Sequence, residues 1–504
     1  MSINIVIKDS FYSYLRQIIG LIVGIVSLPL VLNEFGAVIY GVWVLITSVV
    51  MYLNTVSFGI PTAMQTLVAK TSNLYQKNQI LKISFYLLFT MATITLAIFM
   101  LAINYSSDWV ILFLGNIDDD FVDIAKQLFI IYVVATLIKM PLSLYPNFFV
   151  GMNKVYISEI YQIITLLLNL TIVLACVYFE FDILLFSILM LSVQVFSNVA
   201  SLLHVLLKFA YLKYQPKSLK HPDEVSTRKI LRSGFAFFQV GVAASVVWST
   251  DNLIISHFLS PEQITPYAIA FKIFAFTLIF STVINGVIGP LYGNAYSIRD
   301  YTTIKKYSSV IFKFLPIVSI FVWMSLLFFS KEVVELWTNE DSFGGYLLFF
   351  SLGFYGYILS YVTTYATVIW SLNKAKKTLF VAWGEAILNL ILSIILIQFL
   401  GIGGVALATA FSSLLTSFVF LPKMLKKMTD GGVSYDFSYM KNQFYFLVMP
   451  FITIAVLSIF IQDIKLKIFL FFLSVTLYIL STSFVLTKED KMIFWNVLNK
   501  IKRR

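Results

Sequence analysis

The sequence predicts an all-α integral membrane protein with about fourteen transmembrane helices. We expect two pseudo-symmetric six-helix bundles around a central cavity, followed by a C-terminal helix pair. Three observations predict this fold: an apolar composition, apolar stretches of membrane-spanning length, and an internal repeat. Of the 504 residues, 59% are hydrophobic and only 12% are charged, whereas soluble domains are about half apolar and a quarter charged. With a mean hydropathy of +0.89, this composition excludes a soluble globular enzyme and a disordered chain.

Apolar stretches follow one another along the whole chain. A helix needs about 20 mostly apolar residues to cross the hydrocarbon core. Fourteen stretches meet this requirement, at residues 10–32, 38–60, 80–104, 121–145, 157–179, 183–208, 233–258, 265–292, 306–330, 343–370, 377–399, 402–422, 442–461 and 464–486. The alternating ten-residue segments that are typical of a membrane β-barrel are absent from the sequence.

The positions of Lys and Arg predict that both termini face the cytoplasm. An even number of spans puts the two ends on one side, and cytoplasmic loops are rich in Lys and Arg. Most of the 36 Lys and Arg residues fall on the N-terminal side of the predicted map. Lys465 and Lys467 violate the rule at the last hairpin. The first span has no small-residue cleavage pattern, so we expect a retained helix and not a signal peptide.

An internal repeat relates the two halves of the chain. Residues 145–170 align with residues 365–390, and both segments contain an Asn-Lys pair and a Leu-Asn-Leu triplet. The same register lays the first six spans on the next six, so the halves have one orientation and are related by an axis along the membrane normal. The predicted limits are an N-terminal bundle at 1–210, a cytoplasmic linker at 211–232, a second bundle at 233–425, the helix pair at 442–486 and a basic cytoplasmic tail at 487–504.

The sequence carries no motif for covalent or metal chemistry. One cysteine, Cys176, excludes a disulfide framework, and the three histidines are not spaced as metal ligands. Nucleotide-binding glycine loops, HExxH and GxSxG are absent from the sequence. We therefore expect no enzyme activity, no cofactor, no metal and no nucleic-acid partner. Active transport would draw on an ion gradient, with H+ or Na+ as candidates, or on a partner.

Ionisable residues inside spans are the first site candidates, because each is costly in lipid and should face a cavity or a partner. Asp251 in the seventh span and Lys272 in the eighth lie at similar predicted depths. One interpretation is a structural ion pair. The other is a cavity-facing pair, in which Lys272 contacts an anionic ligand and Asp251 tunes it or takes a proton.

Glu385, Asn169 and Asn389 are further candidates near the middle of their spans. Glu385 is either a proton, cation or substrate site or a carboxylate bonded to a neighbouring helix, and its repeat equivalent is Thr165. Asn169 and Asn389 are equivalent in the repeat. Their expected role is interhelical hydrogen bonding.

Three charged residues lie within about two turns of the predicted inner surface: Arg16, Lys139 and Glu159. Long side chains at such positions usually extend to the membrane surface, which is the interpretation we adopt for Lys139 and Glu159 and one of two for Arg16, a cavity candidate. The alternative for Arg16 is that it reaches into the inner mouth of a cavity.

Short motifs between residues 29 and 60 carry a family resemblance. They are Gly36-Ala37, Tyr40-Gly41, Trp43 and Ser57-Phe58-Gly59, and agreeing stretches follow at Gly151-Met152-Asn153-Lys154, Asp251-Asn252 and Tyr267-x-x-Ala270-x-Lys272. This pattern resembles bacterial polysaccharide flippases of the Wzx type, in the superfamily that includes multidrug and toxin extrusion (MATE) transporters and the lipid II flippase. The likeness covers the first twelve spans best. Many members carry Asp where this chain has Ser57, so any role of that acid is not carried over.

The resemblance implies a function in O-antigen, capsule or exopolysaccharide biosynthesis. An oligosaccharide repeat unit on undecaprenyl diphosphate would cross the bacterial inner membrane, from the cytoplasmic to the outer leaflet, by alternating access. The diphosphate would bind cationic side chains, and the lipid tail would stay among the membrane lipids. A polysaccharide polymerase and a chain-length regulator are the implied protein partners.

Three alternative functions remain open. The first is a cation-coupled small-molecule exporter of the same fold, which should bind cations through carboxylates. The second is a membrane-embedded polymerase or glycosyltransferase, which the short, acidic external loop near 105–120 disfavours. The third is a purely structural partner in a polysaccharide assembly complex.

Overall fold

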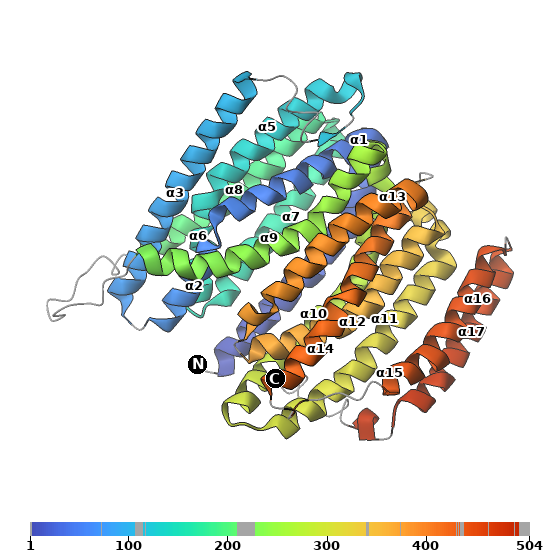
Figure 1. Ribbon diagram of the computed structural model, residues 1–504. Helices are drawn as coiled ribbons and strands as arrows, with labels where there is room; N and C mark the ends of the chain where they lie inside the picture. The colour runs from blue at the N-terminus through green and yellow to red at the C-terminus, as the bar shows by residue number, and fades with distance from the viewer. Residues whose placement is uncertain are drawn as a thin grey trace. The chain divides into compact units, whose positions relative to one another are not determined.

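The computed structural model describes residues 3–71, 73–105, 114–115, 117–208, 227–338, 342–372, 374–429, 431, 433, 438–461, 463–487 and 489–492. Within these ranges the chain is helical and contains no strand, which confirms the predicted all-α class (Figure 1). Most of the predicted linker and of the basic tail, and Asn373 of the repeat, lie outside the described residues.

Packing groups the chain into two compact units, Met1–Thr265 and Pro266–Arg504. The helices of the first unit are α1 (Ile3–Leu53), α2 (Ile60–Lys70), α3 (Leu74–Tyr105), α5 (Asp119–Leu142), α6 (Leu144–Gly151), α7 (Val155–Phe179), α8 (Ile183–Lys208) and α9 (Thr227–Phe258). Helix α10 (Ile264–Ser297) begins two residues before the boundary. The helices after it are α11 (Tyr301–Thr338), α12 (Tyr346–Ser371), α13 (Leu379–Leu415), α14 (Ser417–Met428), α15 (Ser438–Gln443), α16 (Met449–Ile459) and α17 (Ile464–Val485). Short 3₁₀ helices occupy Asn54–Ser57, Pro261–Gln263 and Ala375–Thr378, and a short π-helix occupies Phe444–Val448.

The candidate membrane spans agree with the predicted ones in position but not in number. In the described chain, twelve helices are long and apolar enough to cross a membrane. Two of them, Phe11–Ser57 and Lys376–Met428, each contain two predicted spans. Gly36 (φ 74°) interrupts the first and Gly401 (φ 58°) the second, in backbone conformations that a Cβ atom would disfavour. A glycine thus stands where a short loop was predicted, and the count of fourteen stays a prediction.

Helix α9, the predicted seventh span, packs within the first unit through close backbone contacts. A Cβ atom on Gly59 would lie 2.5 Å from the carbonyl oxygen of Gly234, near the start of α9. Beyond the other end of α9, a Cβ on Gly41 would lie 2.1 Å from the carbonyl oxygen of Pro261. Gly41 and Gly59 belong to the motifs noted above, so these motifs have a packing role. The predicted bundle limits rest on the repeat and stay a prediction.

The C-terminal helices α16 and α17 lie beside α11 in the second unit (Figure 1). The ammonium of Lys467 on α17 donates to Glu332 Oε1 on α11 at 2.5 Å, and the Lys467 side chain is only 2% exposed. Lys313 of α11 donates to Asp490, just beyond α17, at 2.8 Å. The exception to the charge rule at Lys467 therefore has a physical reason, because a carboxylate neutralises this cation inside the protein.

Candidate functional site

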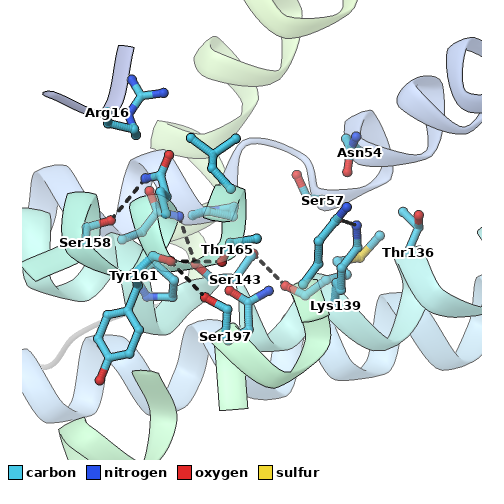
Figure 2. Close-up of a pocket in the computed structure, with 18 residues that line it drawn as sticks. Arg16, Asn54, Ser57, Thr136, Lys139, Ser143, Ser158, Tyr161, Thr165 and Ser197 are labelled. Carbon is cyan, nitrogen blue, oxygen red and sulfur yellow. Dashed lines mark hydrogen bonds between the residues drawn. The ribbon is translucent and has the colours of Figure 1, made fainter. Parts of the chain in front are cut away.

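A polar pocket of about 510 Å³ lies among the helices of the first unit, within the range of typical ligand pockets. Side chains from α1, α2, α5, α6, α7 and α8 line it, together with Asn54 and Ser57 of the short segment before α2. Figure 2 shows Arg16 on one side of the view and Asn54, Ser57 and Thr136 on the other. Because these helices are of membrane-spanning length, a pocket of this polarity is exceptional in its surroundings and marks a candidate binding site.

Helix α7 presents a stripe of polar residues to the pocket. Ser158, Tyr161, Gln162 and Thr165 all line it, and their spacing of three and four residues puts them on one helix face. The Thr165 hydroxyl donates to the Tyr161 carbonyl at 2.8 Å, so the stripe does not disturb the helix.

Helix α8 and helix α5 supply the facing walls. On α8, Gln194, Ser197 and Asn198 repeat the spacing of three and four residues. On α5, Thr136 and Lys139 point to the same pocket. Hydroxyl and amide groups both donate and accept hydrogen bonds, so the walls suit a ligand rich in hydroxyl groups.

Two cations line the pocket and have different partners. Lys139 donates to the neutral amide oxygen of Gln194 at 2.6 Å. Arg16 forms an ion pair with Glu159 of α7 through its Nε atom, and the hydroxyl of Ser13 donates to the other carboxylate oxygen at 2.9 Å. With two cations and one paired carboxylate, the pocket and its border favour an anionic ligand.

The start of α1 is tied to the start of α7 next to this ion pair. The Asp9 carboxylate accepts a hydrogen bond from the backbone N–H of Tyr156 at 2.9 Å, a favourable position for an anion at a helix N-terminus. The Lys8 ammonium lies 3.9 Å from the centre of the Tyr156 ring. Burial raises the pKa of Asp9, with a smaller opposing effect of the Tyr156 hydrogen bond. These contacts tie the two helix starts together about two helical turns before Arg16.

Of the residues predicted as site candidates, Arg16 lines this pocket. Asp251 is buried on α9 in the first unit. Its chain neighbours Thr250 and Asn252 form hydrogen bonds with Tyr52 and Ser48 of α1, respectively. Lys272 belongs to the second unit and its side chain is exposed, so its pairing with Asp251 stays a prediction.

The remaining candidates lie elsewhere. Glu385 of α13 is buried and accepts a hydrogen bond from Ser417 of α14, which is the arrangement expected of a carboxylate bonded to a neighbouring helix. Asn389 donates to Thr409 Oγ1 at 2.9 Å, across the break at Gly401. Asn169 of α7 has no hydrogen-bond partner for its buried Oδ1 atom among the described residues. None of the three lines the pocket.

Lys139 and the polar stripes are site residues that the sequence analysis missed. We interpreted Lys139 as extending to the membrane surface, whereas it lies in the pocket and bonds to Gln194. The available signal was the helical spacing of polar residues within two apolar spans, at 158–165 and 194–198. The ionisable candidates in mid-span, Asp251, Lys272 and Glu385, lie instead in the predicted second bundle.

Sequence comparisons find two related families. The family model described as "Polysaccharide biosynthesis protein" matches residues 6–295, and the model described as "MatE" matches residues 241–395. A putative O-antigen transporter of Salmonella typhimurium is 28% identical over 197 residues, which are 38% of this chain and 45% of that protein. The chain thus matches a little under half the length of this curated relative.

Structural comparisons find the same fold in membrane transporters. The lipid II flippase MurJ, in an inward closed conformation, has a TM-score of 0.72 at 15% identity, covering 98% of this chain and 99% of that one. An inward-facing multidrug resistance MATE family transporter has a TM-score of 0.62 at 13% identity, covering 82% of this chain and 95% of the other. At such identities the similarity is evidence for the fold alone.

Proposed function

Because this chain belongs to the polysaccharide biosynthesis protein family, we propose that it is a flippase for lipid-linked oligosaccharides. Its substrate is an oligosaccharide repeat unit on undecaprenyl diphosphate, which it moves from the cytoplasmic to the outer leaflet. The putative O-antigen transporter and the lipid II flippase MurJ, to which the chain is similar, support this proposal. The protein transports its substrate and makes or breaks no covalent bond.

The polar pocket with its two cations is the observation that carries the proposal. Arg16 and Lys139 attract the diphosphate, and charge-assisted hydrogen bonds to it are stronger than neutral ones. The hydroxyl and amide groups of α7 and α8 bind the sugar hydroxyls. The isoprenoid tail needs no polar contact and remains in the bilayer.

Several features of the transport cycle belong to the proposal. Alternating access by the two pseudo-symmetric halves carries the head group across, coupled to H+ or Na+. The protein resides in the bacterial inner membrane with both termini in the cytoplasm, as the distribution of Lys and Arg supports. A polysaccharide polymerase and a chain-length regulator are its expected partners.

A cation-coupled small-molecule exporter is the second candidate function. The MatE family match and the fold similarity to MATE transporters favour it. An exporter of cationic compounds should present carboxylates to its ligand, but the pocket of the first unit is lined by Arg16 and Lys139. The charge of the pocket therefore favours the anionic lipid-linked substrate.

Complementation of a bacterial strain that lacks its own flippase tests the function. The wild-type chain should restore surface polysaccharide when the matching sugar is supplied. Lys139→Gln and Arg16→Gln should reduce export at least tenfold, because each removes a charged hydrogen bond worth about 1.5–3 kcal/mol. Lys126→Gln is the matched control, since Lys126 is not among the residues that line the pocket and pairs with Asp123 at 3.9 Å.

The readouts are surface polysaccharide, lipid-linked repeat units held inside the cell, and the amount of tagged protein in the membrane. Trapped repeat units with the wild-type chain at normal membrane levels would contradict the flippase proposal. Export of a fluorescent cationic dye by the same cells would favour the exporter instead.

A further inference from the structure

The two cations of the pocket differ in how much charge they offer to a ligand. Lys139 bonds to the uncharged side chain of Gln194, and within the described ranges no carboxylate lies at ion-pair distance from it. Arg16 is paired with Glu159, which offsets its charge. Within the described ranges no carboxylate offsets the charge of Lys139, whereas Arg16 is available to a ligand only if its carboxylate partner releases it.

Glu159 is placed to act on Arg16 without touching a ligand. The Glu159 side chain is 11% exposed, against 33% for Arg16. Glu159 does not line the pocket, although its chain neighbour Ser158 does. One carboxylate oxygen accepts from Ser13 and the other from Arg16. Glu159 thus stays fixed behind Arg16 by a contact that does not depend on the pocket being filled.

The geometry of the pair permits exchange of the anion. Glu159 engages Arg16 at Nε, while a guanidinium carries further N–H donors on its two terminal nitrogens. The rigid fork of guanidinium donors matches the geometry of phosphate oxygens, which makes Arg the preferred side chain for binding phosphate. Arg16 lines the pocket (Figure 2), so an anion that enters can bind these terminal donors and compete with Glu159 for the charge of Arg16.

We propose that the Arg16–Glu159 pair is an exchange site for a phosphate-type anion, in which the ligand replaces the Glu159 carboxylate on Arg16. This inference rests on the proposed function and adds a role for Glu159. In the empty pocket Glu159 neutralises Arg16, which limits the cost of two cations in an apolar environment. When the ligand leaves, Glu159 pairs with Arg16 again, and this competition weakens binding and speeds release.

The test measures binding of farnesyl diphosphate, a short isoprenyl diphosphate, to the purified full-length chain by calorimetry. Glu159→Gln keeps the size and a hydrogen-bond acceptor but removes the competing charge. We expect its Kd to fall about tenfold, which corresponds to about 1.4 kcal/mol. Glu159→Asp, which keeps the charge but shortens the side chain, should lower the Kd by a smaller factor and serves if Glu159→Gln does not fold.

Asp9→Asn is the matched control for net charge. Asp9 lies at the same end of α1, but its carboxylate bonds to the backbone N–H of Tyr156 and not to a lining cation. Its Kd should stay within about twofold of the wild type, since the lost charge does not compete for the ligand. In an Arg16→Gln background, Glu159→Gln should no longer lower the Kd, because the effect passes through Arg16.

The outcomes separate this inference from the proposed function. If the wild type binds farnesyl diphosphate and Glu159→Gln leaves the Kd unchanged or raises it, the exchange site is refuted while the flippase proposal stands. If Asp9→Asn tightens binding as much as Glu159→Gln does, the effect is one of net charge and the exchange site is again refuted. If the wild type binds no isoprenyl diphosphate, both proposals fail.

Discussion

The ion pair between Lys467 and Glu332 should hold the C-terminal helix α17 on α11. Lys467 is 2% exposed and Glu332 is 26% exposed, and their charged atoms lie 2.5 Å apart. Glu332→Gln would leave the ammonium without a counter-charge in a buried position. Breaking a buried pair on one side costs about 3–5 kcal/mol. Because Glu332 is partly exposed, we expect Glu332→Gln to lower the free energy that holds α17 in place by about 3 kcal/mol. This corresponds to a roughly 150-fold larger population with α17 undocked.

A cysteine reporter on α17 measures this undocking. Ser474 is fully buried, and Ser474→Cys in a Cys176→Ser background leaves it as the one reactive thiol. Its labelling by a maleimide should be roughly 150-fold faster in Glu332→Gln, in proportion to the undocked population. The control is Lys331→Gln, which breaks an exposed pair with Glu335 at 3.6 Å and should change the rate little, since surface pairs contribute about 0–1 kcal/mol.

A double replacement shows whether the unpaired charge is the cause. Lys467→Met combined with Glu332→Leu removes both charges and keeps the apolar volume, so it should return the labelling rate close to that of the parent. A Glu332→Gln labelling rate within twofold of the parent would refute the docking role of the ion pair. A double variant that is labelled as fast as Glu332→Gln would refute it too.

Three further predictions follow from local geometry. Gly59→Ala should destabilise the first unit by about 1–3 kcal/mol in thermal unfolding, because its Cβ would approach the Gly234 oxygen to 2.5 Å. Gly241→Ala should not destabilise it, since no described atom lies within 4 Å of the added Cβ. Burial opposes the charged form of Asp490, but hydrogen bonds from Lys313 and Thr487 outweigh it and lower its pKa. Its stabilising contribution should therefore be complete above the ordinary carboxyl pKa of about 3.9 and decline as the pH falls below it, and Asp490→Asn should remove that part of the pH dependence of unfolding. Asn389→Ala should cost about 0.6 kcal/mol through loss of its bond to Thr409, and a loss below the error of the unfolding measurement would contradict this.

The periodic and compositional features of the chain were predictable from the sequence. Apolar runs of spanning length identify the membrane helices, because lipid allows only chains whose backbone bonds are satisfied internally. Each of the fourteen predicted spans overlaps a helix of the described chain. The breaks at Gly36 and Gly401 were not predicted as such, because only the backbone conformation distinguishes a glycine break from a short loop.

The candidate site depended on which helix faces meet, and this only the tertiary structure decided. Arg16 was a candidate from its depth alone, but its partner Glu159 is 143 positions away in the sequence. Lys139 was predicted to extend to the membrane surface, but packing of α8 beside α5 places Gln194 next to it as a hydrogen-bond partner. Lys467 is an exception to the charge rule in the sequence, and only the packing of α17 on α11 shows that Glu332 neutralises it. Charge and spacing along one helix are local properties of the sequence, whereas the neutralisation of a buried charge depends on which helix packs beside it.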